Sequence, residues 1–164
     1  MAIDLHRIDD RLIHGQVVVG WGQPLGLGFI ALVDDEVAGS EWEQELYRMG
    51  VPADMDVYFA TVEDAVARLR EWERDERPGI LLTPDIDTMR RLVEKSGGTI
   101  RRVNLGGIHH RVGRTERLRY LYLSEEEIKE LREMARQGVH ISAQDVPAAR
   151  PLPLEEVLSH SGGG

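Results

Sequence analysis

Hydrophobic residues along the chain form two kinds of pattern, short continuous runs and longer stripes at helical spacing. The runs at 29–33 and 80–82 are apolar throughout, which is typical of strands covered on both faces in a parallel sheet. Between them, Val62, Ala65 and Leu69 recur at the spacing of an amphipathic helix. Because strands and helices alternate, the pattern predicts an α/β fold built around a mostly parallel sheet.

The same reasoning places the remaining elements. Strands are predicted at 2–8, 29–33, 57–60, 80–82, 100–105, 120–123 and 139–143. Helices are predicted at 16–21, 41–49, from Thr61 to the stop at Pro78-Gly79, at 85–95, after Ser124 and at 154–158. Since no linker divides the sequence, residues 1–164 are predicted to form a single domain, with residues 160–164 as a disordered tail.

Polar residues mark the predicted helix starts. Ser40 is placed to cap 41–49, and Ser124 with Glu127 three residues later has the spacing of a capping box. Thr61 with Asp64 is a weaker form of the same signal. Three tryptophans lie in the helical stripes and are expected to pack in the core: Trp21, Trp42 and Trp72.

Composition narrows the class of protein. The chain has 20 Lys and Arg against 29 Asp and Glu, a net charge of −9, which argues against a nucleic-acid or anionic-membrane surface. It has no cysteine, which excludes disulfides, thiol catalysis and cysteine metal sites. No apolar run approaches the ~20 residues of a membrane span, and the first residues lack an apolar signal core. We therefore expect a soluble, acidic, cytoplasmic domain.

The loop after the first strand carries the candidate chemistry, because ligands of open α/β sheets bind beyond the carboxyl ends of strands. His14 is predicted at a helix start, where free N–H groups favour an anion, and Gly15 has no Cβ to obstruct one. Arg11 has a planar fork suited to phosphate, and Asp9 or Asp10 can orient it or accept an imidazole N–H. This set suits a histidine that accepts and donates a phosphoryl group. The alternative is a polar helix-start histidine beside a surface ion pair.

Short motifs along nearly the whole chain resemble those of a single protein family. The segment 7–17, Arg-Ile-Asp-Asp-Arg-Leu-Ile-His-Gly-Gln-Val, resembles the signature of enzyme IIB in the mannose–fructose–sorbose family of the bacterial sugar phosphotransferase system. Supporting matches are Val33-Asp-Asp-Glu-Val37, Asn104-Leu-Gly-Gly-Ile108, Leu123-Ser-Glu-Glu-Glu127 and Val146-Pro147. The resemblance implies an open, mostly parallel sheet of about seven strands with helices on both faces.

The resemblance also implies a function. His14 would take a phosphoryl group from the histidine of enzyme IIA and pass it to a sugar held by the membrane components IIC and IID. Arg11 would stabilise the moving charge, and neither a metal nor an organic cofactor would be needed. The chain would work in the cytoplasm, peripherally associated with the permease. Because related IIB proteins are often dimeric, the resemblance is compatible with a homodimer, and the sugar is not identified. The residues expected to support the phosphate loop are Asp9, Asp10, Gly15 and Gln16.

Two other functions are compatible with the same residues. A regulatory module would carry phosphate on His14 as a signal, without transferring it to sugar. A histidine phosphatase fits less well, because that chemistry usually places arginine directly before the histidine, whereas Leu12 and Ile13 intervene here.

The segment after Gly107 departs from the family pattern. His109-His110 is interpreted as a loop pair beside the site rather than a metal site, because adjacent side chains point apart. Four arginines follow on this acidic chain, and they form either a solvated face or a docking patch for an acidic IIA surface. They are Arg111, Arg114, Arg117 and Arg119.

Overall fold

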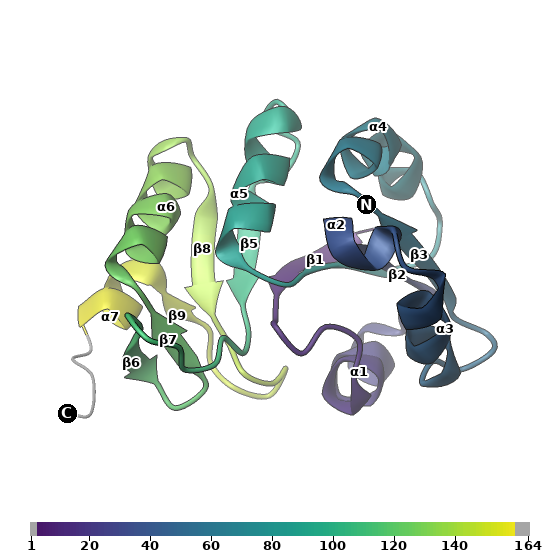
Figure 1. Cartoon of the computed structure of the whole chain (residues 1–164), viewed down its shortest axis with the longest axis horizontal. Coiled ribbons are helices and arrows are strands. Elements are labelled where there is room, and N and C mark those ends of the chain that lie inside the picture. Colours follow the sequence, from purple (N-terminus) through teal and green to yellow (C-terminus); the bar gives the residue numbers. More distant parts are fainter. Residues whose placement is uncertain (1–2, 160–164) are drawn as a thin grey trace.

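A seven-stranded sheet forms the centre of the computed structural model, which describes residues 3–159 (Figure 1). The strand order is β3-β2-β4-β1-β5-β8-β9, and every pairing is parallel except that of β9 with β8. The predicted open, mostly parallel sheet is confirmed; the predicted tail at 160–164 lies outside the described residues. The strands are β1 Ile3–Ile8, β2 Phe29–Val33, β3 Asp56–Ala60, β4 Gly79–Thr83, β5 Arg102–Leu105, β8 His140–Ala143 and β9 Leu152–Pro153.

Helices cover both faces of the sheet, as predicted. One face packs on α4 (Val62–Glu73), α5 (Ile86–Lys95), α6 (Glu125–Arg136) and α7 (Leu154–Ser159). The other packs on the π-helical segment η1 (Gln16–Trp21), α1 (Gly22–Leu25), α2 (Asp35–Ala38) and α3 (Glu41–Met49). Alternate residues of β2 serve the two faces: Phe29 and Ala31 join the first core, Ile30 and Leu32 the second. Both faces being apolar explains the continuous hydrophobic runs.

The predicted caps are formed. The Ser40 and Thr61 hydroxyls accept the Glu43 and Asp64 N–H groups at 3.3 and 3.1 Å. The capping box before α6 is complete, with Ser124 accepting the Glu127 N–H at 3.1 Å and the Glu127 carboxylate accepting the Ser124 N–H at 2.9 Å. Local side-chain chemistry therefore sets these three helix starts.

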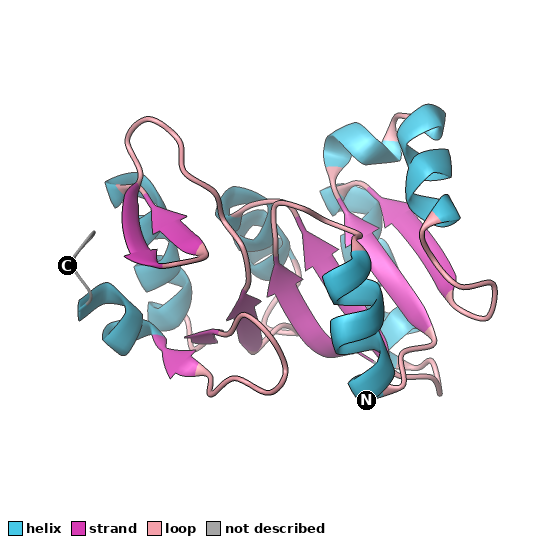
Figure 2. Ribbon diagram, turned by 90° about the horizontal axis from the view of Figure 1, so that it is seen from below, coloured by secondary structure: helices cyan, strands magenta, loops and turns pink. Residues whose placement is uncertain are grey.

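The strand predicted at 120–123 does not join the central sheet. It is β7 (Leu121–Leu123), which pairs antiparallel with β6 (Thr115–Leu118) in a separate two-stranded hairpin (Figure 2). The turn between β6 and β7 sends the chain back on itself, and Ile108 bridges to β7 instead of extending β5. The seventh place in the sheet is taken by β9, which is too short to give a sequence signal.

Trp42 is a second correction, because its side chain is on the surface. It is 71% exposed, and Leu46 and Met49 on the same helix face are 53% and 80% exposed. Helix α3 lies beside β3, an edge strand, and contacts it through Tyr47, whose ring packs near that of Phe59. Periodicity predicts a buried stripe, but at the edge of the sheet α3 packs on the second core through Tyr47, while Trp42, Leu46 and Met49 face outward. Trp21 and Trp72 are buried as expected.

Candidate functional site

The site lies where β1 ends, at the middle of the sheet between β4 and β5 (Figure 1). The chain turns sharply there, with the Leu12 N–H donating to the Asp9 carbonyl at 3.0 Å. Leu12 adopts φ +59°, a left-handed conformation that is unfavourable for a leucine, while its side chain packs in the second core. Burial of Leu12 and Ile13 thus holds the loop in a shape that local preference would not select.

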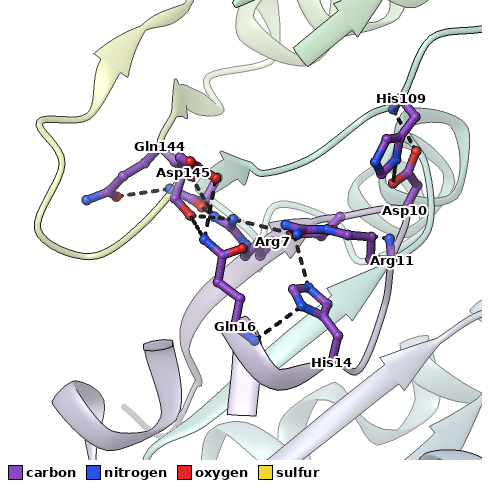
Figure 3. A network of polar contacts seen from close by, with 10 residues as sticks. Arg7, Asp10, Arg11, His14, Gln16, His109, Gln144 and Asp145 are labelled. Carbon is purple, nitrogen blue, oxygen red and sulfur yellow. Dashed lines mark hydrogen bonds and ion pairs between the residues drawn. The ribbon is translucent and has the colours of Figure 1, made fainter. Parts of the chain in front are cut away.

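His14 follows this turn and is held from two sides (Figure 3). Its Nδ1 accepts the backbone N–H of Gln16 at 3.3 Å. Its Nε2 is buried and lies 3.6 Å from Oδ2 of Asp9, longer than a good hydrogen bond but close enough for a strong charge interaction. The predicted helix start is confirmed at Gln16, although the first six residues form a π-helix.

Asp9 is a fully buried carboxylate beneath the imidazole. The backbone N–H and Nε of Arg11 donate to Oδ1 at 3.1 and 3.2 Å, and a terminal guanidinium nitrogen donates to Oδ2 at 3.3 Å. Burial by itself would raise the pKa of Asp9, but contacts with His14, Arg11 and Arg7 outweigh it and hold that pKa well below its usual range. Asp9 is therefore negatively charged at neutral pH.

Arg7 is the functional residue that the sequence reasoning missed. Its side chain is fully buried in β1, where it lies 3.5 Å from Asp9 Oδ2 and stacks 4.8 Å from the centre of the Trp21 ring. It donates to the Asn104 side chain and to the Gln144 carbonyl, the latter at 2.8 Å. The sequence does contain a signal for the role of Arg7, because an arginine inside a strand that is predicted to be buried needs a buried partner.

The first glycine after β5 gives the Arg7 side chain its space. A Cβ at Gly106 would collide with the Arg7 guanidinium, whereas one at Gly107 would make ordinary contact with Arg11. The Asn104-Leu-Gly-Gly motif therefore serves Arg7: its asparagine accepts a hydrogen bond from the guanidinium and its first glycine leaves room for it.

Arg11 leads from the buried carboxylate to solvent, with its side chain 37% exposed. It lines a cleft of about 260 Å³ between the His14 loop and the β6–β7 hairpin. Gln16 lies at the same cleft and donates to the Asp145 carbonyl at 3.3 Å. The lining residues are Arg11, Gln16, Gly107, His109, Arg119, Tyr120, Tyr122 and Asp145.

The other predicted site residues are placed differently. Asp10 turns toward His109, whose backbone N–H and Nδ1 lie 2.7 and 2.6 Å from its two carboxylate oxygens (Figure 3). Its own N–H donates to the Gly107 carbonyl at 2.9 Å, so Asp10 ties the two loops together. Gly15 is exposed, with open space where a Cβ would stand. His110 packs edge-on against the Tyr122 ring.

The four arginines of the predicted docking patch do not act as one surface. Arg114 is mostly buried in a two-pronged ion pair with Glu127, at 2.9 and 2.7 Å, and also donates to the His109 carbonyl. Arg117 donates to the Leu158 carbonyl at 3.3 Å. Arg119 lines the cleft, and Arg111 is exposed outside it. The patch is thus divided between a structural contact, the cleft and the surface.

This geometry suits histidine nucleophilic chemistry on an anion. A buried carboxylate orients the ring and stabilises a positive charge on it, while the Gln16 N–H contacts Nδ1 and the Arg11 guanidinium lines the neighbouring cleft. Within residues 3–159, no helix is long and apolar enough to cross a bilayer.

Comparison with known proteins identifies the family. The family model described as "PTS system sorbose subfamily IIB component" matches residues 3–162. The N-acetylgalactosamine-specific phosphotransferase enzyme IIB component 1 of Escherichia coli K12 is 33% identical over 147 residues, 87% of this chain and 90% of that protein. The mannose-specific EIIAB component of the same strain is 30% identical over 97% of this chain, which spans only 49% of that relative.

Comparison with solved structures gives the same family. The crystal structure of the IIBSor domain of the sorbose permease from Klebsiella pneumoniae superimposes with a TM-score of 0.85 and 28% identity, covering 96% of this chain and 97% of that one. The chain belongs to the sorbose subfamily of PTS IIB components.

Proposed function

We propose that His14 is the phosphoryl carrier of this IIB phosphotransferase, loaded by a phosphohistidine of a IIA component and unloaded onto a sugar at the membrane components IIC and IID. The observation that supports this most directly is the ring of His14 held between a buried, charged Asp9 and the Gln16 N–H at the end of the central strand. The regulatory and phosphatase alternatives gain no support from the comparisons.

The nitrogen that accepts the phosphoryl group is Nδ1. Nε2 is buried and faces the Asp9 carboxylate, so the charged Asp9 favours the tautomer with its proton on Nε2. That leaves the Nδ1 lone pair available as the nucleophile. The Gln16 N–H that now donates to Nδ1 at 3.3 Å is then placed to donate to a phosphoryl oxygen.

The transfer balances without a cofactor. The P–N bond to the donor histidine breaks as the P–N bond to Nδ1 of His14 forms, and the His14 ring becomes positively charged. Asp9 stabilises that charge across 3.6 Å, and Arg11 stabilises the oxygens of the moving group. In the second step the Nδ1–P bond breaks as the sugar hydroxyl bonds to phosphorus, and the freed imidazole accepts the equivalent of the hydroxyl proton.

The remaining assignments follow from these roles. Gln16 supports the loaded loop through its N–H, and Asp10 positions the loop by pairing with His109. Gly15 leaves the approach to the ring open. The name of the mannose-specific relative, EIIAB, joins an A and a B component and supports a IIA donor. We expect the chain to act in the cytoplasm at the permease; the homodimer stays a prediction that light scattering on the purified chain tests.

Incubation with a phosphorylated IIA component, followed by mass-spectrometric mapping of the acid-labile phosphate, tests the carrier residue. We expect one phosphate on His14 and none in His14→Ala, whose circular dichroism spectrum stays that of the wild type. His110→Ala and His140→Ala are the matched controls, since these histidines are exposed and neither lines the cleft. Phosphate on one of them, or on His6 or His109, would overturn the proposal.

A further inference from the structure

We propose that Arg119, at the turn of the β6–β7 hairpin, is a second phosphoryl-binding residue that faces Arg11 across the cleft and contacts the phosphoryl group carried by His14. This inference rests on the proposed function of His14. Arg119 would then have a different role from Arg111, Arg114 and Arg117, although the four arginines are indistinguishable from the sequence alone.

The cleft has two walls from distant parts of the chain. Arg11 and Gln16 come from the loop after β1, on either side of His14 in the sequence. Arg119, Tyr120 and Tyr122 come from the hairpin. With a volume of about 260 Å³, the cleft is large enough for a phosphoryl group and part of the group that delivers it. A side chain on the hairpin wall therefore faces the same space as Arg11.

The hairpin is firmly attached beside the site. The Ile108 N–H donates to the Tyr120 carbonyl at 3.0 Å, and the Tyr122 N–H donates to the Ile108 carbonyl at 2.9 Å. Ile108 directly follows Gly107, whose carbonyl accepts the Asp10 N–H. The backbone of the turn is thus linked to the His14 loop through one short segment, so Arg119 is presented from a fixed position.

The charges around His14 show why a further cation is needed. Arg7 and Arg11 are balanced by Asp9 and by Asp145, which lies at the cleft beside Gln16. A phosphoryl group adds a charge of about −1.5 to −2. The loaded His14 ring supplies one positive charge, so without another positive group up to about one negative charge would remain uncompensated in a partly buried site, where electrostatic interactions are stronger than in water.

Arg119 is the cleft-lining residue that supplies this charge. It forms no ion pair with any residue in the range 3–159, whereas Arg114 nearby is held by Glu127. An unpaired guanidinium at a cleft is free to turn its fork to two oxygens of a phosphoryl group. Two arginines from opposite walls would then hold the phosphoryl group on His14 between them.

Chemical phosphorylation tests this without an identified protein partner. Phosphoramidate donates its phosphoryl group as its P–N bond breaks, a P–N bond to His14 forms and ammonia leaves. The rate of phosphate incorporation is compared for the wild type, Arg119→Gln, Arg119→Lys and the control Arg111→Gln, whose exposed side chain lies outside the cleft. Measurement in about 0.5 M salt suppresses long-range attraction of the anionic reagent, because screening then acts over only a few ångströms.

We expect Arg119→Gln to slow incorporation at least about tenfold and to shift the ³¹P resonance of the phosphohistidine, with Arg111→Gln unchanged. Arg119→Lys should restore part of the rate, because it returns the charge without the fork. Equal rates for Arg119→Gln and the wild type, or equal slowing by Arg111→Gln, would overturn the inference. A wild type that takes phosphate on a residue other than His14 would instead refute the proposed function.

Discussion

Replacing the Asp9 carboxylate by an amide, Asp9→Asn, removes the charge that faces His14 while keeping the shape of the side chain. The Nε2–Oδ2 distance is 3.6 Å. With an effective dielectric constant of about 20, two unit charges at that separation interact by about 4–5 kcal/mol. The ring gains its positive charge only as the phosphoryl group is transferred, so most of this energy acts on the transition state. We expect a loss in rate of about 10³-fold.

The same substitution should also destabilise the fold. Asp9 is the carboxylate 3.5 Å from the buried Arg7 guanidinium, and breaking a buried pair by removing one partner costs about 3–5 kcal/mol. Because contacts lower the folded-state pKa of Asp9, its contribution is present at neutral pH and is lost as pH falls below the ordinary aspartate pKa. Asp9→Asn should therefore lower the free energy of unfolding at pH 7 and remove this acid sensitivity.

Two assays separate the effects. Urea unfolding gives the fraction of folded protein, and single-turnover transfer from a phosphorylated IIA component gives the rate per folded molecule. Asp9→Glu serves as a second variant that keeps the charge but moves it. A wild-type rate per folded molecule in Asp9→Asn would refute the role assigned to the carboxylate, whatever its effect on stability.

Two further predictions concern other positions. Arg11→Lys should not restore the wild-type transfer rate, because an ammonium cannot reproduce the contacts of Nε and the terminal nitrogen with both Asp9 oxygens; equal rates in a single-turnover assay would contradict this. Burial lowers the pKa of His6 to about 4, so folding disfavours its protonation, and stability should fall by roughly 3 kcal/mol as pH falls from about 6.5 to 4. Glu73, 3.9 Å away with a pKa raised by burial, partly offsets this. Urea unfolding between pH 4.5 and 7 should show a flatter profile for His6→Leu but not for the exposed-site control His140→Leu; matching profiles would contradict the assignment.

Features that depend on neighbouring residues were predictable from the sequence. The caps at Ser40, Thr61 and Ser124 and the buried runs of β2 and β4 are of this kind, because local chemistry and period determine them. Nearly all of the predicted strands and helices are present within a few residues of their expected ends. The loop from Asp9 to Gln16 was also located correctly, since β1 ends directly before it.

Features that depend on contacts between distant segments were not predictable. The partner of Arg7 lies 97 residues away at Asn104, and Asp10 pairs with His109, 99 residues away. The division of the arginines follows from Glu127 in the first turn of α6, which pairs with Arg114 directly before β6. Spacing along the chain contains no information on such pairings. The four arginines at 111–119 are therefore predicted as one group, whereas the fold places them in different surroundings.

In the mechanism that we propose, the phosphoryl group is carried on Nδ1 of His14, with Nε2 held by Asp9. Long-range ¹H–¹⁵N correlation spectra of the ¹⁵N-labelled phosphoprotein test it most directly, because they distinguish the two ring nitrogens and show which one couples to ³¹P. We expect ¹⁵N–³¹P coupling at Nδ1 of His14 and a proton on Nε2. Coupling at Nε2, or at a nitrogen of another histidine, would contradict it.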